Sequence, residues 1–195
     1  MNRLAILLLC SSLVACGDDG ITFDPEAESF TAFQGTLDGW VPEDVGLAAG
    51  SSFQVTATQT GARFDILATE AGGAGVLTRE YILTPGVDYL VAIDMVVESS
   101  DGGSQIEPWS IVVGTSVEGG PFELTNVFST QTTGGATTQA FPLFGNIAVT
   151  AGPPESDSDV TSPVRVAIGF QPESADERTY RLREVRVRIT REDSL

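Results

Sequence analysis

The sequence predicts an all-β protein, a sandwich of about ten short antiparallel strands. Two observations predict this class. Apolar and polar residues alternate at every second position in several segments, most clearly in 52–58, 62–68 and 164–170, and this period is typical of strands with one buried face. No window of 11 or more residues keeps the 3.6-residue period of an amphipathic helix.

The expected strands follow one another at intervals of roughly ten residues, with Gly, Pro and Asp between them. Before the first of them, residues 35–40 form a turn that ends on an aromatic residue, Trp40. In chain order we expect strands at 52–58, 62–68, 76–83, 89–97, 109–115, 122–124, 141–149, 164–170 and 179–190. No internal repeat is visible, so the strands belong to one domain.

Two of these strands carry extra information. The segment 89–97 is apolar in both phases except for Asp94, which suits a central strand covered on both sides. Within 179–190 the apolar residues change phase, because Tyr180 and Leu182 share one side while Val185 shares the other with the apolar residues that follow it. A change of phase inside one strand predicts a β-bulge, here near residues 183–184.

The composition excludes several classes of function. All ten basic residues are arginines, and histidine and lysine are absent. Histidine-based catalysis and His-ligated zinc are therefore excluded, as are Schiff-base chemistry and lysine-based phosphate loops. The net charge of −17 repels nucleic acid and anionic lipid headgroups. The two cysteines, Cys10 and Cys16, both lie near the N-terminus, so we expect no disulfide in the folded domain.

The N-terminus has the features of a secretory leader. Arg3 is the only charged residue before Asp18, and an apolar run over residues 4–10 is followed by small residues. A positive start, a short apolar run and a small residue before the cleavage point define a signal peptide. The run up to Ala15 is shorter than the roughly 20 apolar residues that a spanning helix requires, so we expect residues 1–15 to be removed.

The leader ends in Leu13-Val14-Ala15-Cys16, which resembles the lipobox of bacterial lipoproteins. The resemblance implies cleavage before Cys16 and acylation of its thiol and its new amino group. Several acyl chains on one residue hold a protein stably at a membrane. In this family Asp at the next position retains a protein in the inner membrane, so Gly17 implies the outer membrane. An ordinary secretory signal with a chance cysteine is the alternative.

Three stretches resemble the galactose-binding-like jelly roll that many carbohydrate-binding modules share. They are 33–40, which ends in Asp38-Gly39-Trp40, then 83–95 and 180–189. The resemblance implies a jelly-roll sandwich over residues 30–190 and a glycan as ligand. The matching motifs are short and structural, so they indicate the fold rather than the function.

The same resemblance raises the question of a structural calcium ion. Such modules often carry an Asp-Asp pair before the last strand that helps to hold one. Here Arg183 and Glu184 stand at that place, and the positive charge of Arg183 opposes a divalent cation. We therefore expect no tight calcium site, although Asp24, Glu26 and Glu184 would form a poorer one. Residues 155–159 have calcium-loop composition without the EF-hand spacing and are interpreted as a solvated loop.

The candidate site residues are few. Trp40 and Trp109 are the only tryptophans, and tryptophan can stack on a sugar ring, so both are ligand-binding candidates. A core position is the alternative for both, because Trp40 follows a tight turn and Trp109 is in phase with Ile111 and Val113. Asp94, set in an apolar strand, is either a catalytic carboxyl with a raised pKa or, as we prefer, a hydrogen-bond acceptor for a neighbouring loop.

Six arginines are concentrated between residues 178 and 191. Arg186 and Arg188 fall in the polar phase of the last strand, so they share its outer face. There they can pair with the many acidic residues and balance charge on the sheet. An anion-binding stripe is the alternative.

Taken together, the sequence predicts a non-catalytic lipoprotein anchored in the outer membrane through Cys16. Residues 16–29 would form an acidic tether, 30–190 the β-sandwich and 191–195 a C-terminal tail. We expect a ligand-binding module with glycan as the first candidate ligand, and no cofactor, catalytic residue or metal. An assembly lipoprotein that binds another envelope protein is the alternative, followed by a glycoside hydrolase with two carboxylates. The oligomeric state does not follow from the sequence.

Overall fold

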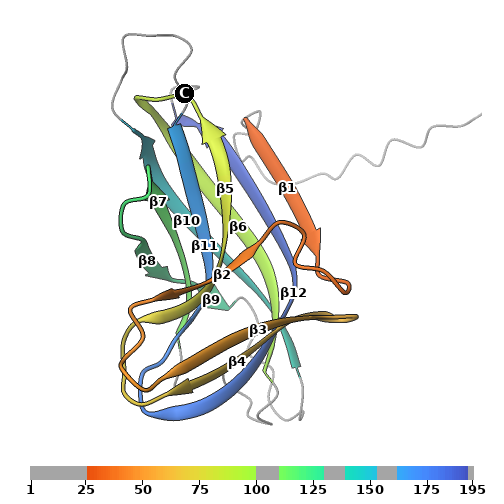
Figure 1. Cartoon of the computed structure of the whole chain (residues 1–195). Coiled ribbons are helices and arrows are strands. Elements are labelled where there is room, and N and C mark those ends of the chain that lie inside the picture. Colours follow the sequence, from red (N-terminus) through yellow and green to blue (C-terminus); the bar gives the residue numbers. More distant parts are fainter. Residues whose placement is uncertain (1–25, 100–109, 130–138, 153–161, 193–195) are drawn as a thin grey trace, which may run out of the picture.

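The computed structural model describes residues 26–99, 110–129, 139–152 and 162–192, which form two antiparallel β-sheets packed face to face (Figure 1). These ranges contain no α-helix, and hence none that is long and apolar enough to span a bilayer. The predicted all-β sandwich is therefore confirmed. The leader, Trp109 and the segment 155–159 lie outside the described residues.

The described residues form twelve strands rather than about ten. They are β1 (Ala27–Ala32), β2 (Val41–Val45), β3 (Ser52–Thr58), β4 (Gly61–Ala68), β5 (Ala74–Leu83), β6 (Val87–Ser99), β7 (Ser110–Val117), β8 (Glu123–Asn126), β9 (Phe128–Ser129), β10 (Gln139–Ala151), β11 (Ser162–Gln171) and β12 (Asp176–Arg191). The sequence analysis did not predict β1, β2 or β9. In β2 a proline and two acids interrupt the apolar pattern, which an edge strand tolerates.

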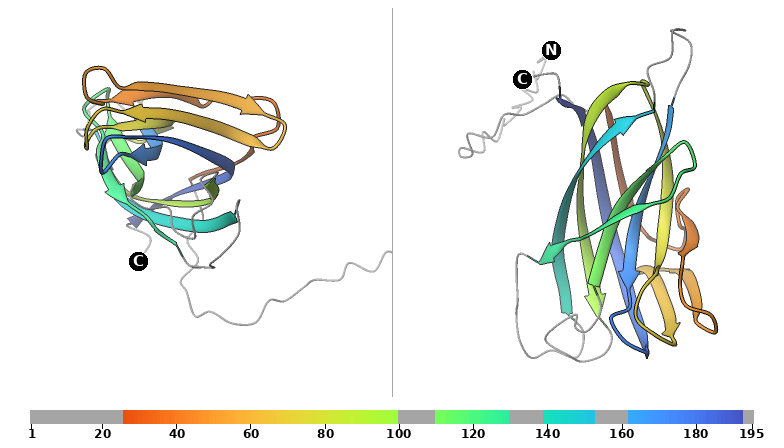
Figure 2. Two further views of the ribbon diagram at one scale, coloured as in Figure 1. Left: turned by 90° about the horizontal axis from the view of Figure 1, so that it is seen from below. Right: turned by 90° about the vertical axis from the view of Figure 1, so that its left-hand side faces the viewer.

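The larger sheet has the strand order β3-β4-β12-β6-β10-β9, with β1 also paired to β12, and the smaller sheet has the order β2-β5-β11-β7-β8. The hairpin of β3 and β4 lies toward one end of the long strands (Figures 1 and 2). Because β1 and β4 pair with the same edge of β12 at different heights, the larger sheet presents β1, β12, β6 and β10 side by side at its other end.

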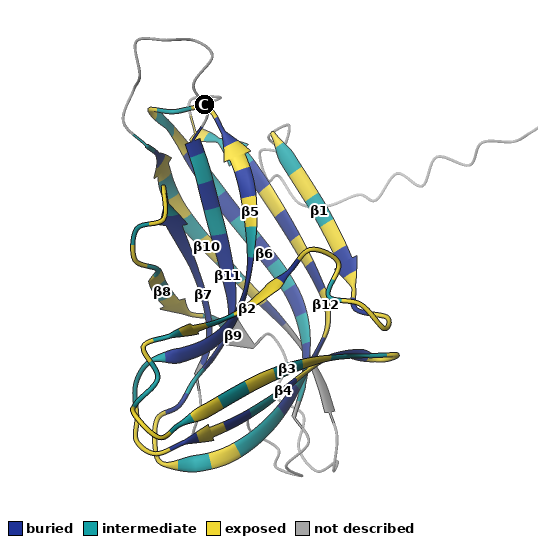
Figure 3. Cartoon of the chain, viewed as in Figure 1, coloured by how far each residue is buried: buried dark blue, intermediate teal, exposed yellow. Residues whose placement is uncertain are grey.

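Strand β12 organises the larger sheet. Its edge opposite β6 pairs first with β4, over residues 176–182, and then with β1, over residues 184–189. The register with β6 shifts between Leu182 and Glu184, which confirms the predicted bulge, and the backbone N–H of Phe33 donates to the carbonyl oxygen of Arg183 at 3.1 Å. The bulge keeps apolar residues facing the core on both sides of it, so buried residues alternate with more exposed ones from Tyr180 to Ile189, except at the bulge, where Arg183 and Glu184 are both exposed (Figure 3).

The core between the sheets contains an aromatic contact that joins them. Phe170 of β11 in the smaller sheet is stacked on Tyr180 of β12, with ring centroids 4.1 Å apart, and meets Phe64 of β4 edge-on at 4.9 Å. All three side chains are at most 1% exposed. Edge-to-face and stacked pairs of this kind stabilise a core beyond the burial of their area.

The outer face of the smaller sheet is closed by side chains that pack on it. Val76, Val112 and Ala167 on this face are 0% exposed, and Phe122 packs against them. The guanidinium of Arg165 lies 4.5 Å from the centroid of the Phe122 ring. The larger sheet has no comparable buried cluster on its outer face among the described residues, and this is the face that carries the candidate site.

Candidate functional site

An open depression of about 350 Å³ lies on the outer face of the larger sheet. It crosses β1, β12, β6 and β10, and one residue from each strand lies in the same register row: Phe30, Arg186, Asp94 and Phe144, in that order. The remaining lining residues are Met95, Val96, Leu143 and Glu184. A set of charged and aromatic side chains is thereby gathered across four strands that are far apart in the sequence.

Two exposed phenylalanines stand at the ends of this row. The side chain of Phe30 is 53% exposed and that of Phe144 is 44% exposed. Since neighbouring strands lie about 4.8 Å apart, three strand spacings place the two residues about 14 Å from each other. Large apolar side chains exposed beside a depression are typical of a binding surface.

Between the two rings lies an arginine with only loose contacts. Arg186 Nε is 4.0 Å from the nearest carboxylate oxygen of Glu28, and its guanidinium is 5.6 Å from the centroid of the Phe30 ring. Its side chain is 51% exposed. The guanidinium can therefore donate hydrogen bonds to a ligand without first losing a short ion pair.

The acidic residues of the depression differ in their contacts. Asp94 accepts a hydrogen bond from Arg188 at 2.8 Å, so its partner is a neighbouring strand and not the loop that we expected from the sequence. Glu184 has no ion pair and no hydrogen bond to any described residue. The site thus offers one carboxylate that is already paired and one that is available.

Strand β6 forms the floor, and here the structure corrects the sequence analysis. The strand is central in its sheet, between β12 and β10, but it is covered on one side only. Val91 and Ile93 face the core and are 0% exposed, whereas Ala92 and Val96 on the other side are half-buried. The second apolar phase of β6 therefore makes a partly exposed surface beneath the depression, because no second layer of described residues packs on it.

Several arginines of β12 pair with acids of neighbouring strands, as the charge-balancing interpretation predicted. Besides Arg188 and its partner in β6, Arg181 and Arg183 both contact Glu98 of β6, at 3.0 and 3.3 Å. The pair of Arg188 and Asp94 is about half-exposed and individually weak, whereas Glu98 is only 14% exposed beneath its two arginines.

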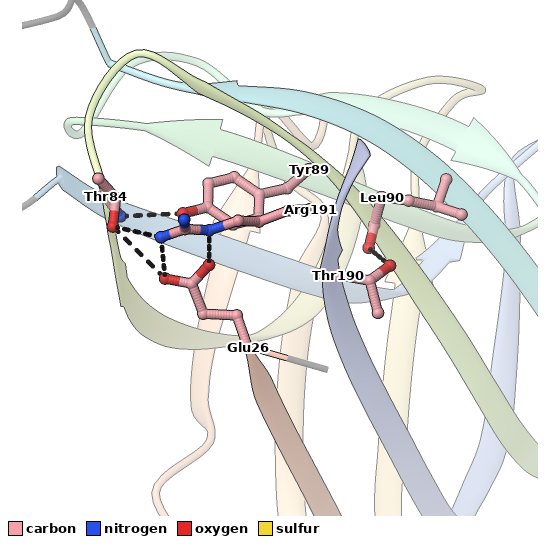
Figure 4. A network of polar contacts seen from close by, with 6 residues as sticks. All are labelled: Glu26, Thr84, Tyr89, Leu90, Thr190 and Arg191. Atoms are coloured by element: carbon pink, nitrogen blue, oxygen red, sulfur yellow. Dashed lines mark hydrogen bonds and ion pairs between the residues drawn. The ribbon is translucent and has the colours of Figure 1, made fainter. Parts of the chain in front are cut away.

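The two described residues that were considered for calcium, Glu26 and Glu184, do not converge. Glu26 lies before β1 and receives hydrogen bonds from Arg191, the shorter at 2.6 Å, and from the Thr84 hydroxyl at 3.4 Å (Figure 4). The Arg191 hydrogen bond lowers the pKa of Glu26. Glu184 lies beside the depression, and Asp24 lies outside the described residues. In the part of the chain that the structure describes, no three acidic side chains form a metal-binding group.

Of the two tryptophans predicted as ligand-binding candidates, Trp109 lies outside the described residues and Trp40 does not line the depression. Trp40 is only 3% exposed, and its Nε1 donates to the Thr31 hydroxyl at 3.2 Å, so its ring is part of the core. The sequence analysis instead missed Phe30 and Phe144. A weak signal for Phe30 exists in β1, where the aromatic alternates with the small polar residues Ser29 and Thr31 that face inward.

Comparison with solved structures identifies the sandwich as a jelly roll of the kind found in carbohydrate-binding modules. A module described for specific mannan recognition, TmCBM27, superposes with a TM-score of 0.50 at 7% identity, covering 84% of this chain and 96% of that one. A xylan-binding module, CBM15, gives 0.47 at 16% identity over 83% and 97%. The CBM22-1 xylan-binding domain from Paenibacillus barcinonensis gives 0.40 at 17% identity over 87% and 95%. No family model matches the sequence, and no curated protein matches it.

Proposed function

We propose that this chain is a non-catalytic glycan-binding module whose ligand lies across the outer face of the larger sheet. The observation that carries the proposal is the row of Phe30, Arg186, Asp94 and Phe144, in which one exposed ring stands at each end and two charged groups lie between them. The jelly-roll fold and the mannan-recognition module that shares it support the same function.

The chemistry of the row suits a sugar chain. A sugar ring has an apolar face of C–H groups and a rim of hydroxyls, each of which can donate and accept a hydrogen bond. Phe30 and Phe144 offer apolar surfaces for the former, while the guanidinium of Arg186 donates and the carboxylate of Glu184 accepts for the latter. Ligand sites generally combine an apolar lining with a few polar groups that fix orientation. The spacing of the rings, about 14 Å, favours an oligosaccharide over a single sugar.

The same geometry argues against hydrolysis. Asp94 and Glu184 both line the depression, and a pair of carboxylates is the minimum for a glycosidase. One member of such a pair must act as a general acid, which requires a carboxyl held in a buried apolar setting. Asp94 is 49% exposed and engaged by Arg188, and Glu184 is exposed. We therefore propose binding without catalysis.

We also propose that this module is held at the outer membrane. A lipid on Cys16 would anchor the chain in the outer membrane, and the residues that follow would act as a tether for the sandwich. The support for this part of the proposal is the sequence Leu13-Val14-Ala15-Cys16. A module held by lipid and a tether would retain a glycan at the membrane surface.

Binding by the purified full-length protein to mannan, xylan and β-1,4-galactan, measured by affinity electrophoresis and calorimetry, tests the proposal. Phe30→Ala and Phe144→Ala should each weaken binding at least tenfold, about 1.4 kcal/mol. Leu67→Ala is the matched control, because Leu67 is also exposed, at 44%, but lies on β4 away from the depression. Unchanged affinity in both Phe variants would refute the proposed site. Absence of glycan binding, with co-purification of an envelope protein instead, would favour the assembly alternative.

A further inference from the structure

We infer that this site selects neutral glycans over anionic ones such as uronic acid polymers, and that Glu184 is the residue that discriminates between them. The inference rests on the proposed function and specifies the class of ligand. It does not follow from the presence of arginine, which on its own would suggest the opposite selectivity. It follows from the positions of the acidic groups around that arginine.

Arg186 lies between two carboxylates. Glu184 is two residues before it on β12, on the same face and about 6.6 Å away along the strand. Glu28, on β1, approaches it from the other side, with its carboxylate oxygen 4.0 Å from Arg186 Nε. An anionic group drawn to the guanidinium would therefore lie close to negative charge on both sides.

The second arginine near the depression, Arg188, does not offset this negative charge. Arg188 is held by Asp94 at 2.8 Å, so its charge is already compensated. The local set of Glu28, Asp94, Glu184, Arg186 and Arg188 carries one more negative than positive charge. The net charge of −17 on the whole chain adds a background field of the same sign, which lowers the local concentration of anionic ligands.

A neutral sugar chain meets no such opposition. One hydroxyl accepts a hydrogen bond from Arg186, and its neighbour on the sugar ring donates one to Glu184. Hydrogen bonds in which one partner is charged are stronger than those between neutral groups. The alternation of a donor and an acceptor along β12 thus matches two adjacent hydroxyls and disfavours a carboxylate at the same place.

The test uses β-1,4-galactan and mannan oligosaccharides, each before and after oxidation of their C6 hydroxyls to carboxylates. The new sugar carboxylate would lie about 6 Å from the carboxylates beside Arg186, and like charges repel at this distance. We therefore expect the purified full-length protein to bind the oxidised form about tenfold more weakly in dilute buffer. The difference should shrink in 0.5 M NaCl, because salt screens exposed charges. The measured quantity is the ratio of the two affinities for one oligosaccharide, obtained by calorimetry.

Glu184→Gln keeps the size of the side chain and an accepting oxygen but removes the charge, so this ratio should fall several-fold towards one. Glu177→Gln is the matched control, since Glu177 is exposed on the same strand beyond the bulge and outside the depression. The ratio of the two affinities in this variant should equal that of the wild type. Equal or tighter binding of the oxidised forms by the wild type would overturn the inference and leave the proposed function intact. The same ratio in both variants would also overturn it. Failure to bind either form would overturn the proposed function and the inference together.

Discussion

The aromatic contact between the sheets provides a direct test of how the sandwich is held together. Phe170→Ala removes a ring that is 1% exposed, is stacked on Tyr180 at 4.1 Å and meets Phe64 at 4.9 Å. Replacing a buried Phe by Ala destabilises a protein by about 3–5 kcal/mol, because apolar contacts are lost and a cavity remains. Because two aromatic pairs are lost as well, we expect the upper part of that range, about 4–5 kcal/mol. A domain of this size loses roughly 2–4 °C per kcal/mol, so the melting temperature should fall by about 8–20 °C.

Urea unfolding followed by tryptophan fluorescence measures this loss, since Trp40 is buried in the folded state. Phe170→Leu is the control, because it keeps most of the volume and should cost about 1–2 kcal/mol. A loss below about 2 kcal/mol for Phe170→Ala, with an unchanged dependence on urea, would show that the ring does not join the sheets as described.

Four further predictions follow from the fold and the sequence. Arg191 lowers the pKa of Glu26, so their pair stabilises the fold fully above the usual glutamate pKa of 4.5, and this stabilisation is lost as the pH falls through the lowered pKa. The melting temperature of Glu26→Gln should therefore be below that of the wild type at pH 7 and equal to it at about pH 2. A difference in melting temperature that persists in acid would contradict the pairing. Deletion of Arg183 removes the bulge and shifts one half of β12 by a residue, which turns the apolar side chains of that half outward. Near-ultraviolet circular dichroism should then show a loss of tertiary structure, whereas a native spectrum would show that the bulge does not set the register. Cys16→Ser should move the protein from the membrane fraction to the soluble fraction and abolish its acylation as seen by intact mass, whereas an unchanged distribution would remove the lipid anchor. The melting temperature should be the same in EDTA and in millimolar calcium, because a site at 100-fold saturation would add about 2.7 kcal/mol, and a rise of several degrees would reveal a calcium site.

Much of the fold could be predicted because most of its strands bury one face. The alternation in 52–58 and 164–170 corresponds to β3 and β11, and the change of phase in β12 located the bulge. Strand β1 could not be predicted in this way, because its pattern is inverted. Its inward side chains include Ser29 and Thr31, which bond to Tyr81 and Trp40 in the core, while its aromatic faces out.

The site was missed for the same physical reason. Tryptophan is the rarest aromatic residue here and the commonest sugar platform, but Trp40 is part of the core. Phe30 lies in the inverted strand, next to what was expected to be a tether. Phe144 lies in β10, where Leu143 beside it is buried, so apolar residues occur in both phases and the sequence does not show which faces out. The row also depends on the pairing of four strands, which the sequence does not specify.

The central claim, that the outer face of the larger sheet binds glycan, is tested most directly by NMR. The backbone amide resonances of the full-length protein would be followed during titration with the oligosaccharide that binds most tightly among mannan, xylan and galactan fragments. We predict the largest shifts in the strands that cross the depression, around Phe30, Asp94, Phe144 and Arg186, with those near Arg165 on the outer face of the smaller sheet unchanged. Shifts centred on β5, β11 and β7, or no shifts with any of the three glycans, would contradict the account.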